Sequence, residues 1–393
     1  MPGWHKQISD LVEDGKVAMV GIIQEQHPDR CRLFAQWQGF KWPILHDPMN
    51  IIPTRAVPLV IAIDEHGVVQ SRRPRPDWVR NEFLKTDYPA PGDIKPSQGS
   101  YVAPPSENEI ASPKAELLWG AAKYRSAKPE NKMSASAFVD KAIAAYDKAV
   151  EQNPDDGPAH FGRGVALRMR YESPRRRPTD FQDAVAAWDR ALEIDPNQYI
   201  YRRRIQQYGP RLMKPYPFYD WVVKARTEIK ARGEEPIALA IEPEGAEIAT
   251  PSRVFKTTDA KNPDPAGKIN RDKKKLIEIS NVTVPAKVKA GQTARVHVDL
   301  RPSKNGKWNN EASPVQVWMN TPDGWELERP LFELKQPPQA ESMEARRLEF
   351  EVKLPKSAKS TTLTGYVLYY VCESDDGTCL YLRQDISVPI AVR

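Results

Sequence analysis

Two cysteines near the end of the chain are the residues best placed to do chemistry. Cys372 and Cys379 flank the polar segment 374–377, which ends in Asp-Gly, and aromatic-rich apolar runs lie outside them. An Asp-Gly turn between such runs predicts a β-hairpin. Strands that fold back on this turn can bring the two Cβ atoms close enough for a disulfide. With three cysteines in the whole chain, this pair is the dithiol that the sequence predicts.

Three interpretations of the pair stay open at this stage. A structural disulfide would close a very short loop and stabilise the fold by about 2 kcal/mol. A pair that exchanges disulfides needs solvent access and a stabilised thiolate. The acidic residues Glu373, Asp375 and Asp376 beside the turn disfavour the thiolate. A reduced pair would be inert packing.

The third cysteine, Cys31, falls in the first turn of a helix that Pro28 is expected to open. A helix N-terminus lowers a thiol pKa, and Arg30 and Arg32 would add to this effect. Cys31 is therefore either a reactive single thiol or a packing cysteine, and a lone cysteine cannot run a dithiol cycle. The six histidines show no metal-ligand spacing, and no phosphate loop or nucleophile elbow occurs. The sequence predicts no metal and no cofactor.

The charge and hydropathy of the chain limit the classes of partner that it can have. Among 393 residues, 58 are basic and 52 acidic, a net charge of +6. This mild excess, spread over short clusters, does not indicate a nucleic-acid binder, so we expect other proteins as partners. No stretch has the length of a transmembrane helix. The cysteine hairpin favours an extracytoplasmic or periplasmic location, whereas residues 1–6 show no signal peptide and favour the cytoplasm. The oligomeric state is unknown from the sequence.

Residues 1–90 alternate helix and strand patterns. A continuous apolar run at 17–23 predicts a strand buried on both faces, and the helix opened by Pro28 follows. Further strands are expected at 42–45 and 57–64, and a turn at 65–67 joins the last of these to residues 68–71 in a hairpin. This order resembles the thioredoxin-like fold.

The resemblance also assigns roles and shows a departure. It implies that Pro58 is the cis-proline that lies against the family's active site. Residues 27–30, His-Pro-Asp-Arg, stand where the family has Cys-x-x-Cys. The resemblance therefore implies a degenerate, redox-inactive thioredoxin-like domain that is kept for binding.

A proline-rich linker at 91–114 leads into a helical region at 115–235. That region repeats one spacing of small residue, aromatic, small residue and proline: Ala142, Tyr146, Ala149, Pro154, and again Ala184, Trp188, Ala191, Pro196. The pattern resembles the second helix of a tetratricopeptide repeat (TPR). The module would be either a peptide-binding face or a spacer that docks the flanking domains, and a last helix at about 219–231 would cap it.

Residues 236–393 read as short strands separated by Gly-, Pro- and Asp-bearing turns, which indicates an immunoglobulin-like β-sandwich. Residues 308–311 are expected to be a loop with an exposed aromatic residue. The cysteine hairpin on the last strands resembles the N-terminal extracytoplasmic domain of the membrane-spanning thiol:disulfide interchange reductase. In that family the two cysteines carry electrons, and the resemblance implies this role for Cys372 and Cys379.

The sequence thus predicts a multidomain chain of α/β, all-α and all-β parts: thioredoxin-like, TPR-like and immunoglobulin-like. The leading hypothesis is a protein that acts through protein–protein interaction within a thiol-redox pathway. The alternative hypothesis is a thiol–disulfide oxidoreductase that uses Cys372 and Cys379.

Overall fold

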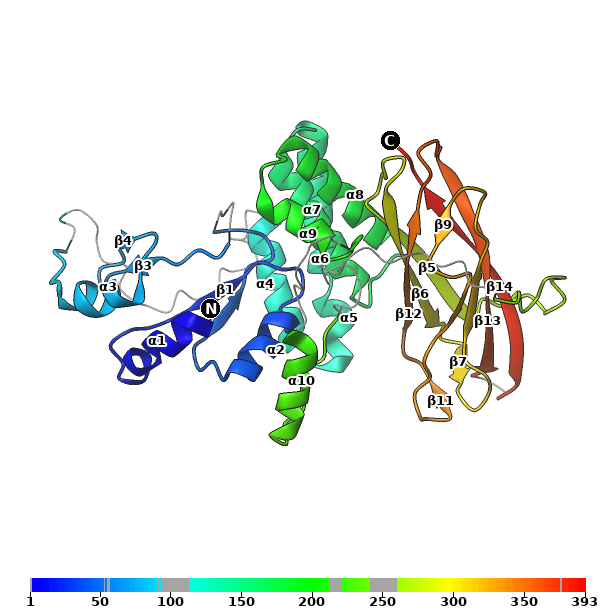
Figure 1. Ribbon diagram of the computed structural model, residues 1–393, viewed down its shortest axis with the longest axis horizontal. Coiled ribbons are helices and arrows are strands. Elements are labelled where there is room, and N and C mark those ends of the chain that lie inside the picture. The colour runs from blue at the N-terminus through cyan, green and yellow to red at the C-terminus, as the bar shows by residue number, and fades with distance from the viewer. Residues whose placement is uncertain are drawn as a thin grey trace.

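The computed structural model combines helices with β-sheets, most of them antiparallel. It describes residues 2–52, 54, 57–90, 92, 113–211, 221–240, 260–374 and 377–393. Most of the predicted linker at 91–114 lies outside these residues. An N-terminal region, a group of helices and a pair of sheets follow one another along the long axis (Figure 1). Within the described ranges, no helix combines the length and apolar character needed to cross a bilayer.

The N-terminal region contains two small separate sheets. Its elements are α1 (Pro2–Glu13), β1 (Gly21–Ile23), α2 (Asp29–Gln38), β2 (Ile44–His46), β3 (Ala62–Ile63), β4 (Val69–Ser71), α3 (Pro76–Asn81) and the short 3-10 helix Phe83–Lys85. β1 pairs with β2 in parallel, and β3 pairs with β4 as the predicted hairpin. The two pairs form different sheets.

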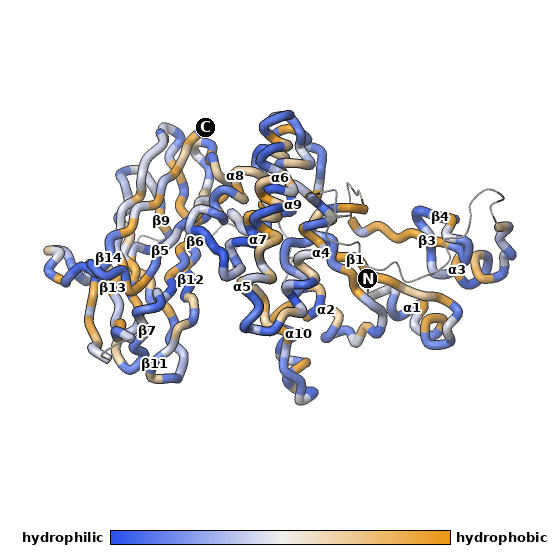
Figure 2. The backbone as a smooth tube through the Cα atoms, turned by 180° about the vertical axis from the view of Figure 1, so that it is seen from behind, coloured by the Kyte–Doolittle hydropathy of each residue, from blue (hydrophilic) through white to orange (hydrophobic). Residues whose placement is uncertain are grey.

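The predicted strand at 17–23 is shorter and more exposed than expected. Only Gly21–Ile23 form a strand, and the side chains of Val20 and Ile22 are 50% and 45% exposed. Val57 and Leu59, in the apolar segment that leads to β3, are also exposed, and Figure 2 shows that segment in orange. The prediction that this strand is buried on both faces is wrong. β1 and β2 form a sheet of their own, β3 and β4 form another, and one face of β1 is left uncovered.

The helical region follows the predicted pattern closely. It contains α4 (Pro113–Ser126), the 3-10 turn Pro129–Asn131, α5 (Lys132–Ala135), α6 (Phe138–Gln152), α7 (Gly157–Tyr171), α8 (Asp180–Ile194) and α9 (Tyr199–Gln206). Glycines on α7 let large rings approach its backbone. A Cβ at Gly164 would lie 2.3 Å from Nε1 of Trp188, and one at Gly162 would lie 2.5 Å from the Tyr146 ring. The small-and-aromatic spacing seen in the sequence therefore reflects helix packing.

The last helix of this region, α10 (Trp221–Ala231), does not cap the array as expected. Its buried residues Val222 and Ile229 share a cluster with Leu33 of α2. The rings of Trp221 and Trp37 stack with centroids 6.0 Å apart. α10 therefore extends the packing of the N-terminal region, because its apolar face meets α2.

The C-terminal region contains two antiparallel sheets that enclose one apolar core. Its strands are β5 (Ile277–Val284), β6 (Thr293–Pro302), β7 (Gly306–Asn309), β8 (Gln316–Met319), β9 (Glu326–Leu327), β10 (Leu331–Glu333), β11 (Glu341–Ser342), β12 (Arg346–Lys353), β13 (Thr361–Glu373) and β14 (Cys379–Ile390). One sheet has the order β5-β6-β12-β9. The other runs β10-β8-β13-β7-β11, and β14 also pairs with β13.

Trp308 corrects the predicted loop at 308–311. Its side chain is fully buried on β7, where the ring meets Tyr369 edge-on with centroids 6.0 Å apart. Its Nε1–H donates to the carbonyl of Glu344 at 2.8 Å. An indole with its N–H satisfied belongs to the core, so this aromatic residue offers no partner surface.

Candidate functional site

The cysteine hairpin forms as the sequence predicts. β13 and β14 pair antiparallel over 12 residue pairs that end at Cys372 and Cys379. The two cysteines are directly opposite each other, with Cα atoms 3.9 Å apart, and are joined by a disulfide. Gly377, in the turn, has a φ of 69°, a left-handed conformation that glycine adopts without strain. The pair is therefore oxidised in the structure, as the structural and the exchange interpretations both require.

The two sulfur-bearing residues differ in access. Cys372 is 2% exposed, whereas Cys379 is an exposed residue at the start of the last strand. A thiolate attacks a disulfide in line with the S–S bond and displaces the far sulfur, and the exposed cysteine, Cys379, is the one that solvent reaches. The thiolate of Cys372 would then be the leaving group.

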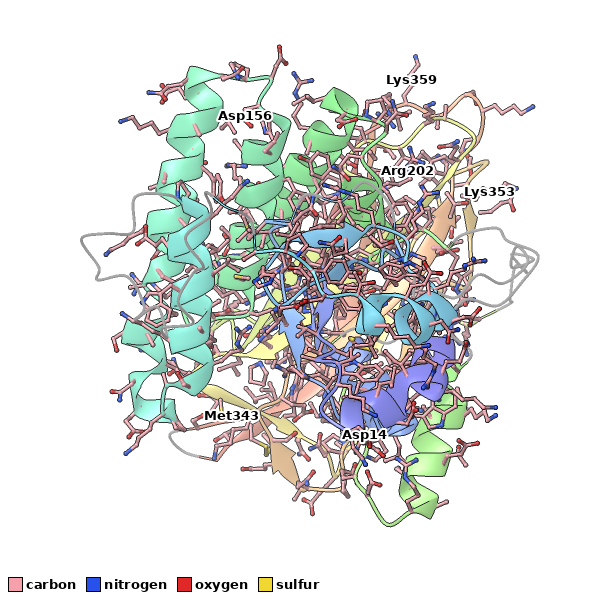
Figure 3. The ribbon with its side chains drawn as sticks, turned by 90° about the vertical axis from the view of Figure 1, so that its left-hand side faces the viewer. Asp14, Asp156, Arg202, Met343, Lys353 and Lys359 are labelled. Carbon is pink, nitrogen blue, oxygen red and sulfur yellow. A yellow bond between two sulfur atoms is a disulfide. The ribbon has the colours of Figure 1, made fainter. Side chains whose placement is uncertain are left out.

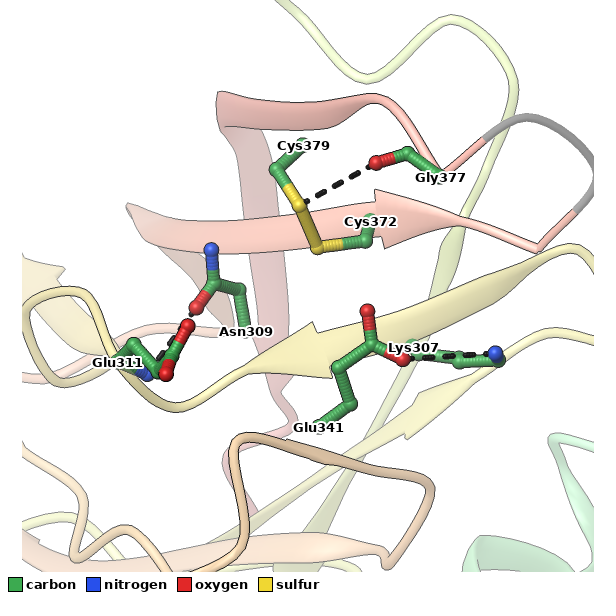
Figure 4. The surroundings of a disulfide bond; sticks show 7 residues. All are labelled: Lys307, Asn309, Glu311, Glu341, Cys372, Gly377 and Cys379. Atoms are coloured by element: carbon green, nitrogen blue, oxygen red, sulfur yellow. Dashed lines mark hydrogen bonds and ion pairs between the residues drawn. A yellow bond between two sulfur atoms is a disulfide. The ribbon is translucent and has the colours of Figure 1, made fainter.

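The surroundings of the disulfide come from two further strands of the same sheet, β7 and β11. Lys307 on β7 is the register partner of Cys372, and its Nζ lies 3.4 Å from Oε2 of Glu341 on β11. In Figure 4 the Glu341 carboxylate rises from below toward the Cys372–Cys379 bond. Residues directly opposite each other on paired strands share a face of the sheet. The disulfide, the ammonium and the carboxylate therefore occupy one face.

Two tyrosines extend this face along the hairpin. Tyr370 and Tyr381 are register partners, and their rings stack with centroids 4.4 Å apart. Tyr381 is 36% exposed. Because side chains two residues apart lie on the same side of a strand, the ring pair adjoins the disulfide and provides apolar contact area next to it.

Cys31, on α2, and Pro58, before β3, are the other predicted site residues. Figure 1 shows α2 and β3 apart from the hairpin strands β13 and β14. Burial, with a further contribution from Glu25, raises the pKa of Cys31 to about 11. These effects outweigh Arg32 and oppose the interpretation of Cys31 as a reactive thiol. The Val57–Pro58 peptide bond is cis, as the resemblance implies, but Pro58 precedes a strand of a different sheet from the one that α2 follows.

A buried arginine joins the N-terminal region to the helices. Arg204 on α9 is 1% exposed, and it donates to Oε1 of Gln26 at 2.7 Å and to the carbonyls of Gln24 and Pro48 at 2.8 and 2.9 Å. Desolvation lowers the pKa of Arg204 from 12.5 to about 10. The Arg204 guanidinium therefore bridges three acceptors, and it reaches all three only when residues 24–48 are correctly placed against α9.

A second polar junction joins the helices to the sheets. The Tyr171 hydroxyl donates to Oδ2 of Asp299 at 2.7 Å. The amide N–H of Thr283 donates to Oε1 of Gln182 at 2.9 Å, and that of Ala286 donates to Asp189 at 2.7 Å. A cavity of about 30 Å³ lies at this junction, which gives room for one or two water molecules but not for a substrate. The junction is a structural contact.

Sequence inspection missed Lys307 and Glu341. They lie on strands of four and two residues, too short for a periodic pattern to show. Both residues are far from Cys372 in the sequence, so the sequence does not show that they lie near it in the fold. The one signal available was Lys307 itself, a charged residue directly before Trp308 and the predicted loop at 308–311.

Comparisons with known proteins leave the family open. No family model matches the chain, and no curated protein matches it either. Among solved structures, the yeast GGA1 GAE domain is 12% identical and covers 28% of this chain and 90% of its own, with a TM-score of 0.18. The bacterial hydrophobin BslA is 13% identical and covers 30% of this chain and 95% of its own, with a TM-score of 0.16. Likenesses at such low TM-scores carry no argument about fold or function.

Proposed function

We propose that this protein acts through protein–protein interaction in a thiol-redox pathway, with the Cys372–Cys379 hairpin as its contact point. The observation that carries the proposal is the exposed Cys379 of a cross-strand disulfide on an open sheet face. The tyrosine pair beside the disulfide offers contact area for a docked protein. A staple that served stability alone would have no need of this access.

The helices serve in this proposal as the spacer that holds the outer regions in register. The support is that their polar side chains are used on both sides, by Arg204 toward the N-terminal region and by Tyr171 toward the sheets. Both connections are buried. Of the two functions weighed for the helical module, docking of flanking regions is favoured by these contacts over peptide capture.

The three family assignments belong to the same proposal. The close contacts of Gly162 with Tyr146 and of Gly164 with Trp188 support TPR-type packing. Two antiparallel sheets around one core support an immunoglobulin-like sandwich. The parallel pair β1–β2 and the cis bond before Pro58 support a degenerate thioredoxin-like region.

A second function, thiol–disulfide oxidoreductase, is favoured by the unequal exposure of the two cysteines. A partner thiolate would attack Cys379 Sγ, forming a mixed disulfide while the Cys372–Cys379 bond breaks. Cys372 would leave as a thiolate; its register partner Lys307 is ion-paired with the Glu341 carboxylate. Attack by the partner's second thiolate on its own sulfur of the mixed disulfide then releases the reduced hairpin and an oxidised partner.

One binding experiment separates the two functions. We would measure the affinity of a thioredoxin-class dithiol protein for the parent chain and for the Cys372→Ser/Cys379→Ser variant, with far-UV circular dichroism as the folding control. Equal affinity supports the interaction protein. Binding that is lost in a folded double variant supports the oxidoreductase. If the parent itself neither binds this probe nor is reduced by it, both functions are wrong.

A further inference from the structure

The reduced hairpin carries a donor set that its oxidised form conceals. Among the residues that the structure describes, Cys372, Cys379 and Glu341 have potential ligand atoms that all lie within 4.8 Å of one another. Two sulfurs and one carboxylate oxygen are a ligand combination that Zn²⁺ accepts. We propose that reduction of the Cys372–Cys379 disulfide creates a Zn²⁺ site completed by Glu341.

The geometry of the hairpin suits a tetrahedral ion. With Zn–S bonds of about 2.3 Å and Zn–O bonds of about 2.1 Å, the ligand atoms of a tetrahedral site lie about 3.5–3.8 Å apart. Cys372 and Cys379 are register partners on one face of the sheet, so their thiolates can adopt this spacing by side-chain rotation. The Glu341 side chain, 46% exposed, needs to move by only about 1 Å to join them.

The local charges favour the ion. In the oxidised form the Lys307 ammonium faces the Glu341 carboxylate at 3.4 Å, and the two charges cancel. Two thiolates would add two negative charges at the same place. A divalent cation restores neutrality, because three negative ligands are then balanced by Zn²⁺ and by the ammonium of Lys307.

The site has an entry path and an open position. Cys379 and Glu341 are exposed, so an ion reaches the site from solvent, whereas Cys372 supplies a buried ligand from within the sheet. Three protein ligands leave the fourth position to water, as in zinc sites that exchange ligands. The ion would block attack on either sulfur, which couples metal occupancy to the redox state of the hairpin.

The steps balance in electrons and protons. A dithiol reductant gives two electrons and two protons to the hairpin and becomes a disulfide, while the Cys372–Cys379 bond breaks. Binding of Zn²⁺ then displaces the two thiol protons to solvent. The inference rests on the proposed function only in requiring that the hairpin can be reduced.

Cobalt titration of the full chain tests the site. In a Cys31→Ser background, with the hairpin reduced, we expect one Co²⁺ per chain with thiolate-to-cobalt charge-transfer absorption, displaced by Zn²⁺. The oxidised chain should show none. Glu341→Gln should weaken Co²⁺ binding at least tenfold, whereas Glu311→Gln, at a nearby exposed carboxylate drawn in Figure 4, should leave it unchanged.

Two results would overturn the inference: no charge-transfer band in the reduced chain, or equal affinity in the parent and Glu341→Gln chains. The second result would mean adventitious binding by two thiolates alone. Failure here is distinguishable from failure of the proposed function. A chain that a thioredoxin-class dithiol reduces but that does not bind Co²⁺ contradicts only the zinc site, whereas a hairpin that this dithiol cannot reduce contradicts the redox role.

Discussion

Replacement of Arg204 by methionine should loosen the N-terminal region from the helices. Methionine keeps most of the side-chain volume but donates no hydrogen bond. The change removes three donated bonds, to Gln26, Gln24 and Pro48. The Gln26 amide, which donates to the Val165 carbonyl, and the contact of His27 with the Tyr208 hydroxyl also join the two regions, so the change should loosen the contact without separating it.

The expected loss of free energy is the balance of two opposing effects. Each buried acceptor left without a donor costs about 1–3 kcal/mol, so three acceptors cost about 6 kcal/mol. Against this, the variant no longer buries a charge. The fall in the pKa of Arg204 from 12.5 to about 10 corresponds to about 3 kcal/mol of desolvation. The expected net loss is about 3 kcal/mol, or roughly a hundredfold in the opening equilibrium of the contact.

Hydrogen exchange measured by mass spectrometry reads this opening directly. The amide of Asp47, which donates to the carbonyl of Ile23 at 2.8 Å, should exchange roughly a hundredfold faster in Arg204→Met, whereas the sheet amides of β13 should not change. Arg202→Met is the matched control, because Arg202 is an exposed residue of the same helix whose guanidinium donates to the Pro196 carbonyl rather than to the N-terminal region; its position is labelled in Figure 3. Equal protection in parent and Arg204→Met chains would refute the connector role.

Three further predictions concern packing, pH and reactivity. Gly164→Ala should lower the free energy of unfolding by about 1–3 kcal/mol in urea titration, because its Cβ would overlap Trp188; an unchanged midpoint contradicts the packing argument. Burial raises the pKa of Asp189 from 3.8 to about 6, so the folded chain binds the proton of this carboxyl more tightly than the unfolded chain does. Stability should therefore fall by up to about 3 kcal/mol as the pH rises from 4 to 6, and Asp189→Asn should abolish this slope. Because burial raises the pKa of Cys31 to about 11, iodoacetamide should not label this thiol in the native chain at pH 8, and rapid labelling would show that it is accessible.

The parts of the fold that local patterns specify were predictable. The spacing of Ala142 and Tyr146, repeated at Ala184 and Trp188, located α6 and α8, because helix packing needs small and aromatic residues at fixed turns. The Asp-Gly turn located the hairpin for the same kind of local reason. The register that places Cys372 opposite Cys379 follows from the length of that turn.

The contacts between regions could not be predicted. α10 packs on α2, about 190 residues earlier in the chain, because their apolar faces match. No local pattern in 219–231 distinguishes this partner from the preceding helices. The strand patterns at 17–23 and 57–64 do not show which strands pair, because pairing is decided by long-range contacts that a strand pattern does not contain.

The neighbours of the disulfide were missed for a similar reason. Glu341 belongs to a two-residue strand, and Met343, just beyond it, is exposed at the lower edge of the view in Figure 3. Such a segment has the composition of a loop. Only its pairing with β7 brings the carboxylate to the hairpin.

The reduction potential of the Cys372–Cys379 pair tests the central claim most directly. We would equilibrate the Cys31→Ser chain in dithiol buffers of graded potential and quantify the reduced hairpin by mass spectrometry after alkylation. Because Cys379 is exposed, we predict a midpoint above about −300 mV, in the range of exchange proteins. A midpoint well below about −300 mV would identify a structural staple and contradict the proposed redox contact.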